Sequence, residues 1–261
     1  MSNADLERAG LVLDKGKGVY DRFRDRLIFP ITDLDGRVIG FGGRAIGHEP
    51  GPKYINTPET LLYKKSRALY GMSQAKDEIR KAGVAILVEG YFDVLLPYQA
   101  GIRNVVGVCG TALTPEHLEL LKRCDCREIV ILFDGDAAGT GAPPQVAAAV
   151  FHAGFSARVA RLEGDPDEYV RAHGRAGFEA LVAAAPALTE YLIDQAIQHR
   201  TGTAAATHAS VEQKIAIVRM LTPHAFALPE GLARSAFERR IAQRLALDVG
   251  ALRAEVQRLA T

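Results

Sequence analysis

The sequence lacks any long apolar run. No stretch of the 261 residues approaches the roughly 18 to 20 consecutive apolar residues that a membrane-spanning helix needs. The amino-terminal segment also lacks the charged, apolar and small-residue regions of a secretory signal peptide. These absences predict a cytoplasmic protein with no membrane partner.

Cysteine is scarce as well. The three cysteines are Cys109, Cys124 and Cys126, and the last two form a C-x-C pair. A structural zinc site needs four ligands, and the sequence offers neither a second cysteine pair nor a histidine at ligand spacing from this one. We expect no structural zinc and interpret the cysteines as ordinary reduced thiols.

The chain carries almost no net charge. Its 32 Lys and Arg residues nearly balance 31 Asp and Glu residues, which gives a formal charge of +1. This balance excludes a strong overall attraction to nucleic acid, so any such attraction must come from a local basic patch. With 48% hydrophobic residues the chain can bury a good core, as one domain with subdomains or as two small domains.

The sequence does contain a buried strand that ends on two acids. Five apolar residues at 129–133 are typical of a strand in a parallel sheet, and Asp134 and Asp136 follow them. Open α/β sheets bind their ligands at this end of a strand, and two neighbouring carboxylates favour a hard divalent cation between them. The alternative is that one acid caps the next helix and the other is solvated.

A second apolar run has the same ending. Residues 84–88 read VAILV and lead directly to Glu89, which is followed by a helical pattern. The 40 residues between the two apolar runs have room for a helix, a strand at 104–108 and a helix at 115–123. The series strand, helix, strand, helix, strand therefore carries acids on its first and third strands.

Further elements are expected on both sides of this series. Arg22, Arg24 and Arg26 alternate, which would place them on one face if residues 22–31 form a strand. Asp35-Gly36 predicts a hairpin to a strand at 38–44, whose Gly42-Gly43 pair permits a bulge or a close backbone approach. The remaining expected elements are helices at 66–82, 143–152, 178–199, 210–221, 229–247 and 249–259, and a strand at 158–162.

A basic patch is present between residues 20 and 67. Nine Lys and Arg residues face six Asp and Glu residues there, and they come from different short elements. A solvated basic face on a small antiparallel sheet is one interpretation. A surface that binds phosphate is the other, because Arg grips phosphate with two hydrogen bonds and Lys acts as a movable point charge.

Ordered motifs resemble a known family. VEGYFDV at 88–94 and FDGDAAG at 133–139, with GTALTPEHLELLKR between them, resemble the Toprim domain. The upstream segments YDRFRDRLIFPI, GRVIGFGGR, PKYINTPET and YKKSRALYG, and EGDPDEYVRAHG downstream, are similar to bacterial DNA primases of the DnaG type. The resemblance runs through most of the chain, in order and at matching spacing.

The resemblance implies the architecture. The expected fold class is α/β, a Toprim fold whose central, mostly parallel sheet is flanked by helices, with a preceding basic α+β subdomain and a C-terminal helical bundle. The expected boundaries are 5–82 for the basic subdomain, 83–175 for the Toprim subdomain and 176–261 for the helical subdomain. The family's zinc-binding domain, the front of its polymerase domain and its helicase-binding domain are expected to lie outside this chain.

The resemblance also implies the site residues. The catalytic residues would be Glu89, Asp134 and Asp136, and they would bind Mg²⁺ or Mn²⁺ together with Asp165 and Asp167. For Asp165 and Asp167 the alternative is a surface turn that caps a helix. The residues matching the family's template-binding and nucleotide-binding ridge are Arg22, Arg24, Arg44, Lys53, Tyr54, Asn56 and Lys65.

The function implied is DNA-directed synthesis of RNA primers in replication by metal-dependent nucleotidyl transfer. Its partners would be a single-stranded DNA template, nucleoside triphosphates, the RNA primer and a replicative helicase bound through a domain outside this chain. The alternatives are a Toprim nuclease or a topoisomerase-type DNA cleavage enzyme, and a Toprim scaffold without activity. The upstream basic motifs disfavour the first, no tyrosine stands in a recognisable nucleophile context for the second, and the retained acids disfavour the scaffold.

Overall fold

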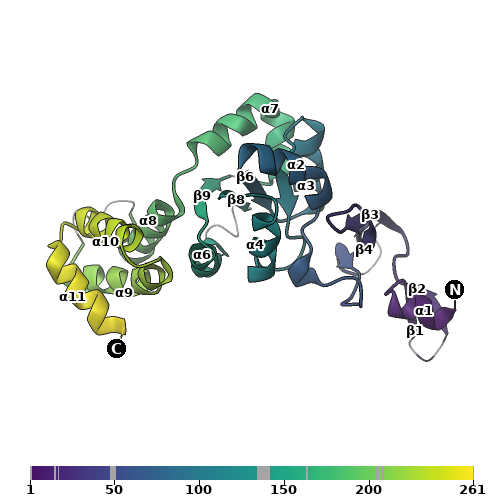
Figure 1. Ribbon diagram of the computed structural model, residues 1–261, viewed down its shortest axis with the longest axis horizontal. Coiled ribbons are helices and arrows are strands. Elements are labelled where there is room, and N and C mark those ends of the chain that lie inside the picture. The colour runs from purple at the N-terminus through teal and green to yellow at the C-terminus, as the bar shows by residue number, and fades with distance from the viewer. Residues whose placement is uncertain are drawn as a thin grey trace. The chain divides into compact units, whose positions relative to one another are not determined.

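The structure, a computed structural model, contains both α-helices and β-strands (Figure 1). It describes residues 2–14, 16, 18–47, 51–133, 142–162, 164–203, 206 and 209–260. Within these ranges, no helix combines the length and the apolar composition needed to cross a bilayer.

The chain divides into two compact units. The first unit comprises Met1–Cys126 and Asp165–Phe178, and the second comprises Arg127–Gly164 and Glu179–Thr261. The segment 165–178 therefore packs with the amino-terminal part of the chain. The domain boundaries expected from the sequence, at 82/83 and 175/176, stay a prediction.

The central sheet has the predicted parallel character. Strand β6 pairs in parallel with β7, and β8 pairs in parallel with β9, in the order β7-β6-β8-β9. Residues 85–88 of β6 and 129–132 of β8 are all buried, as expected for strands covered on both faces. The four strands are β6 (Val84–Val88), β7 (Val105–Gly107), β8 (Glu128–Phe133) and β9 (Ser156–Arg161).

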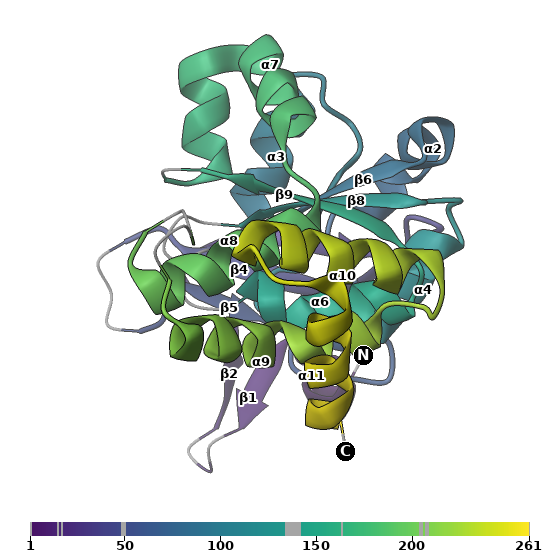
Figure 2. The same cartoon turned by 90° about the vertical axis from the view of Figure 1, so that its left-hand side faces the viewer.

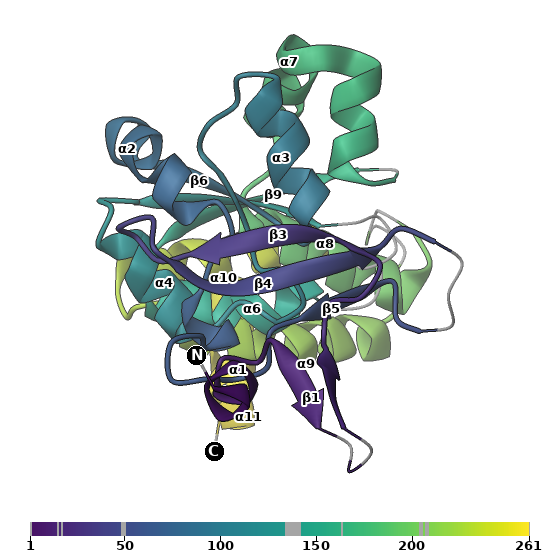
Figure 3. The ribbon, with the colours of Figure 1, turned by 90° about the vertical axis from the view of Figure 1, so that its right-hand side faces the viewer.

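An antiparallel sheet lies in the first unit (Figure 3). Its order is β3-β4-β5, and Gly36, with φ +83°, makes the turn of the predicted hairpin between the first two strands. The backbone at Gly42 does approach another side chain closely, because an added Cβ would lie 2.2 Å from the Tyr91 ring. The strands are β3 (Arg26–Thr32), β4 (Val38–Ala45) and β5 (Tyr54–Asn56), and a separate ribbon pairs β1 (Val12–Asp14) with β2 (Val19–Asp21) after helix α1 (Asn3–Arg8).

Two expectations about this part of the chain were wrong. Residues 22–25 form a turn rather than the start of a strand, because Asp25 has a φ of +50°, which aspartate tolerates in turns but no strand residue adopts. Arg22 and Arg24 therefore do not share a strand face with Arg26. The expected helix at 66–82 begins only at Met72, since Tyr70 exchanges two main-chain hydrogen bonds with Gly107.

The helices of the first unit cover its strands. Helices α2 and α3 both contact β7, and α4 contacts the short helix η1. Thr114 caps α4, since its hydroxyl accepts a hydrogen bond from the main-chain N–H of His117 and Pro115 occupies the first turn. The helices are η1 (Lys65–Arg67), α2 (Met72–Ala82), α3 (Tyr91–Gln99) and α4 (Pro115–Lys122).

The predicted carboxy-terminal helices are present, but the first of them already begins at Pro166, in the first unit, and does not run unbroken to residue 199. The expected helix at 178–199 is broken at residues 185–187, because Pro186 lacks an N–H and disfavours helical geometry in the residue before it. The helix predicted from Pro143 begins at Ala142. The observed helices are α6 (Ala142–His152), α7 (Pro166–Ala184), α8 (Leu188–Thr201), α9 (Val211–Ala227), α10 (Leu232–Leu245) and α11 (Val249–Ala260).

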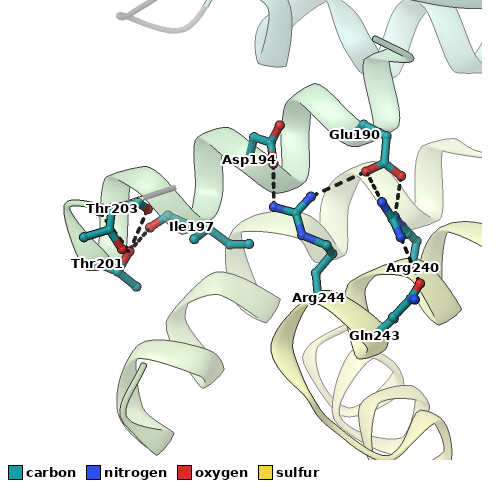
Figure 4. Close-up of polar contacts among 8 residues, drawn as sticks. All are labelled: Glu190, Asp194, Ile197, Thr201, Thr203, Arg240, Gln243 and Arg244. Carbon is teal, nitrogen blue, oxygen red and sulfur yellow. Dashed lines mark hydrogen bonds and ion pairs between the residues drawn. The ribbon is translucent and has the colours of Figure 1, made fainter. Parts of the chain in front are cut away.

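Helices α8 to α11 pack together in the expected bundle (Figure 2). Two acids of α8 face two arginines of α10 (Figure 4). Arg240 donates to both carboxylate oxygens of Glu190 at 2.7 and 3.0 Å, and Arg244 donates to Asp194 at 2.6 Å and lies 3.5 Å from Glu190. The Arg244 side chain is 24% exposed, so this ion-pair network is partly shielded from solvent.

Removing the shared arginine is expected to weaken the bundle. Arg244→Ala should lower the free energy of unfolding by about 1 kcal/mol, because two carboxylates lose a charge-assisted partner. This exceeds the contribution of a typical fully exposed ion pair to stability. Urea unfolding followed by helical circular dichroism measures the change. Arg239→Ala, an exposed position on the same helix, is the control, and equal unfolding midpoints for the two variants would contradict the prediction.

Candidate catalytic site and basic surface

Glu89 lies on a turn that hydrogen bonds hold from both sides. It directly follows β6, is half-buried, and its carbonyl accepts a hydrogen bond from the Cys109 N–H at 2.9 Å. The next N–H, that of Gly90, donates to a carboxylate oxygen of Asp93 at 2.8 Å. Asp93 is buried and closes the first turn of α3. The first predicted catalytic acid therefore sits at the carboxyl end of a parallel strand, on an ordered turn.

The other two predicted catalytic acids, Asp134 and Asp136, lie outside the described residues. Strand β8 is described to its last residue, Phe133, which immediately precedes Asp134. The predicted strand that leads to these acids is therefore present, and their role stays a prediction.

Asp165 and Asp167 stand at the start of α7, within the first unit. Asp165 is exposed, whereas the Asp167 side chain is 14% exposed and lies 3.5 Å from Arg171. Burial raises the pKa of Tyr54, Arg44 lowers it, and the negative charges of Asp93 and Asp167 raise it further. Asp93 and Asp167 thus each lie within electrostatic range of Tyr54.

The donor chemistry of these acids suits a hard divalent cation, because such ions take carboxylate oxygens as ligands. In the part of the chain that the structure describes, however, no group of three or more His, Cys, Asp or Glu side chains is arranged to hold a metal. The predicted ligands Asp134 and Asp136 lie outside the described residues, and their part in the site stays a prediction.

Among the predicted nucleic-acid ligands of the first unit are cations that lie over aromatic rings. The Arg44 guanidinium is 4.8 Å from the ring centroid of Phe92 and 5.7 Å from that of Tyr54, and Lys53 Nζ is 5.9 Å from the latter. Arg24 lies 4.8 Å above the Tyr20 ring and is exposed. We call Arg24, Arg44, Lys53 and Tyr54 the basic surface. These guanidinium and ammonium groups lie over aromatic rings, and none of them forms an ion pair with another residue that the structure describes.

Two other predicted ligands, Arg22 and Asn56, use their side chains inside the protein, and a third, Lys65, is held there by its main chain. Arg22 donates from Nε and Nη2 to the main-chain carbonyl of Asn56 at 3.2 and 3.1 Å. The Asn56 side chain donates to the Cys109 carbonyl and accepts from the Tyr91 hydroxyl, both at 2.8 Å. The main-chain carbonyl of Lys65 is hydrogen-bonded to the buried His117 ring at 2.8 Å.

Tyr91 and Cys109 both lie next to the Glu89 turn, although no role was predicted for either of them in the site. Tyr91 falls inside the VEGYFDV motif, and the motif alone does not show that its hydroxyl reaches a strand 35 residues earlier. Cys109 has a φ of +44°, a conformation that sequence patterns do not reveal for a residue other than glycine. The three cysteines are buried, and none is in a disulfide.

Comparison with known proteins identifies the family. The model of the DNA primase catalytic core, N-terminal domain, matches residues 1–76, and the Toprim domain model matches residues 83–161. The crystal structure of a DNA primase domain from Pseudomonas aeruginosa superposes with a TM-score of 0.85 at 34% identity, covering 97% of this chain and 79% of that one. The chain belongs to the DnaG family of DNA primases.

Other primases give the same picture. The DNA primase of Myxococcus xanthus is 44% identical over 240 residues, which cover 90% of this chain and 39% of that protein. The chain thus spans about two fifths of the length of that relative. A DnaG primase catalytic domain solved with bound single-stranded DNA matches with a TM-score of 0.83 at 32% identity, covering 95% of this chain and 77% of that one. These matches confirm the Toprim-containing α/β fold that the sequence predicts.

Proposed function

We propose that the chain is the catalytic core of a primase that copies single-stranded DNA into short RNA by nucleotidyl transfer. The observation that carries this proposal is that one unit contains both the ordered Glu89 turn and the basic surface. An acid at a strand end supplies a metal ligand, and stacked cations supply phosphate and base contacts. The relatives named DNA primase support the same assignment.

The metal ligands in this proposal are Glu89, Asp134 and Asp136, and the metal is Mg²⁺ or Mn²⁺. Asp165 and Asp167 would add ligands or water-mediated contacts. When bound, such cations lower the pKa of a ribose 3′-hydroxyl and neutralise the triphosphate of the incoming nucleotide. Glu89 would hold a cation or accept the hydroxyl proton, and positioned acid-base help of this kind is worth about 100- to 10,000-fold in rate.

The basic surface would hold the template and the nucleotide. Arg44 and Lys53 offer charge to phosphates, and Arg24 and Tyr54 offer planar groups on which bases stack. Burial raises the pKa of Tyr54, which favours its protonated hydroxyl, a group that can donate a hydrogen bond to a ligand. Nucleoside triphosphates, the RNA primer and a replicative helicase, contacted through a domain outside this chain, complete the proposed set of partners.

The test is RNA synthesis on single-stranded DNA with labelled nucleoside triphosphates and either Mg²⁺ or Mn²⁺. Wild type is compared with Glu89→Ala and Asp134→Ala. We expect oligoribonucleotides from the wild type alone, and none without the cation. Cutting of the template that requires the same two acids would instead identify a nuclease and refute the proposal.

Binding of single-stranded DNA is expected to weaken as salt rises, because each neutralised phosphate releases counterions. Lys53→Ala should reduce the slope of log K against log salt by about 0.7, the value for one phosphate contact on a single strand. Fluorescence anisotropy at several salt concentrations measures both slopes. Lys81→Ala removes the same charge from an exposed position on α2, so a slope change as large as that of Lys53→Ala would contradict the prediction.

A further inference from the structure

The Asn56 side chain joins two segments that flank Glu89. Asn56 ends β5, and its amide nitrogen donates to the Cys109 carbonyl while its amide oxygen accepts from the Tyr91 hydroxyl, both at 2.8 Å. The main-chain carbonyl of Asn56 is itself held by Arg22. We call the side chains of Asn56 and Tyr91 with the main chain of Cys109 the Asn56 clasp.

In the clasp, both the nitrogen and the oxygen of the Asn56 side-chain amide form hydrogen bonds within the protein. Only the nitrogen can donate to the Cys109 carbonyl, so the oxygen must point at the Tyr91 hydroxyl, which then donates. A rotated amide would set its oxygen against the carbonyl oxygen, and two acceptors repel. The orientation therefore follows from the partners, and both ends of the amide have a partner inside the protein.

Both anchors of the clasp act on the Glu89 turn. Tyr91 is the first residue of α3, two positions after Glu89. Cys109 reaches Glu89 from the other side, since its N–H donates to the Glu89 carbonyl at 2.9 Å. The clasp thus ties β5, the strand that carries Tyr54 of the basic surface, to the turn that carries the acid.

The clasp is built from rigid parts. The Tyr91 ring is 3% exposed, stacks on Phe29 with centroids 4.5 Å apart and meets the Tyr70 ring edge-on at 4.7 Å. Cys109 keeps its φ of +44°, a conformation that is strained for residues other than glycine and persists only where surrounding contacts hold it. Its main-chain bonds to Asn56 and Glu89 are such contacts.

We propose that Asn56 is a positioning residue that acts through Tyr91 and Cys109 to fix the main chain of Glu89 for metal binding. The inference rests on the proposed function, because it takes Glu89 as a metal ligand. It assigns Asn56 a different task from the nucleotide contact that the family resemblance implies. Groups that orient a metal ligand typically change metal affinity about 10- to 100-fold when they are removed.

Two variants test the clasp by deleting its hydrogen bonds. Tyr91→Phe removes one oxygen and keeps the packed ring, and Asn56→Ala removes the amide. We expect each to weaken Mn²⁺ binding, measured with Mn²⁺ alone by electron paramagnetic resonance, about 10-fold. The double variant should bind Mn²⁺ about as tightly as the single variant with the lower affinity, because the two side chains act together. Hydrogen exchange at the Cys109 amide should accelerate in both.

Matched controls separate the clasp from general loss of structure. Tyr98→Phe deletes the same hydroxyl from the same helix, α3, and Asn104→Ala deletes an asparagine that bonds the Val84 carbonyl at the opposite end of β6. Both controls should bind Mn²⁺ as the wild type does. Circular dichroism spectra of Tyr91→Phe and Tyr98→Phe should both match that of the wild type, which would show that both variants fold.

Two results would overturn the clasp. The first is that Tyr91→Phe and Asn56→Ala bind Mn²⁺ as tightly as the wild type while Glu89→Gln does not bind it. This result would contradict the clasp but not the proposed function. The second is weaker nucleotide binding in the absence of metal for Asn56→Ala alone, which would make Asn56 a nucleotide contact. Wild-type Mn²⁺ affinity in Glu89→Gln would instead remove Glu89 as a ligand, and the proposed metal chemistry would fail with it.

Discussion

Glu89→Gln is expected to reduce RNA synthesis by at least about 100-fold, the lower end of the effect of a positioned acid or base. Glutamine keeps the size of the side chain and removes its charge, so the turn after β6 keeps its shape while a hard cation loses an anionic ligand. Single-stranded DNA should bind as tightly as it does to the wild type, because the basic surface is untouched. Labelled nucleotide incorporation and fluorescence anisotropy measure the two quantities.

A matched acid shows whether this effect is local. Glu116, an exposed acid in the first turn of α4, lies in the same unit, and Glu116→Gln removes the same charge. We expect Glu116→Gln to synthesise RNA at the wild-type rate. If Glu89→Gln synthesised RNA at the wild-type rate, Glu89 would not be a catalytic residue.

Gly42→Ala is expected to destabilise the first unit more than any other glycine-to-alanine substitution near the site. The new Cβ would lie 2.2 Å from the Cζ and hydroxyl oxygen of Tyr91, closer than packed carbon atoms tolerate. The ring has little room to retreat, because it lies between Phe29 and Tyr70 in a buried cluster. Overpacking of this kind costs about 1 to 3 kcal/mol, and any shift of the ring also strains its bond to Asn56.

A second glycine of the same region is the control for overpacking. A Cβ at Gly47 would meet no atom within 4 Å, so Gly47→Ala should unfold as the wild type does. Urea unfolding followed by tyrosine fluorescence compares the two variants with the wild type. Equal midpoints for Gly42→Ala and Gly47→Ala would show that the cluster around Tyr91 adapts freely to the added methyl group, and would contradict the prediction.

The sequence predicted the central sheet well because its signals are local. The apolar runs at 84–88 and 129–133 are long enough to mark strands covered on both faces, and the structure has β6 and β8 there. The Asp35-Gly36 hairpin depends on one glycine with positive φ, which the residue type itself indicates. Glu89 was placed correctly at a strand end because it is the residue after such a run.

The errors arose where distant contacts override local preference. The local sequence at 66–71 favours a helix, but α2 begins only at Met72 because Tyr70 forms a β-bridge with Gly107. The partners of Asn56 lie 35 and 53 residues away in sequence, so no local pattern could show that its amide is engaged inside the protein. Family resemblance named Asn56 as important, and the geometry supplies the physical reason that we propose for its importance.

The most direct measurement of the central claim is the sequence of the RNA product made on two different single-stranded DNA templates. The wild-type chain is incubated with each template, all four nucleoside triphosphates and Mn²⁺, and the products are sequenced by mass spectrometry. We predict short oligoribonucleotides that are complementary to the template supplied and change when the template changes. Identical products on both templates, or no RNA on either, would contradict the assignment of template-directed RNA synthesis to this chain.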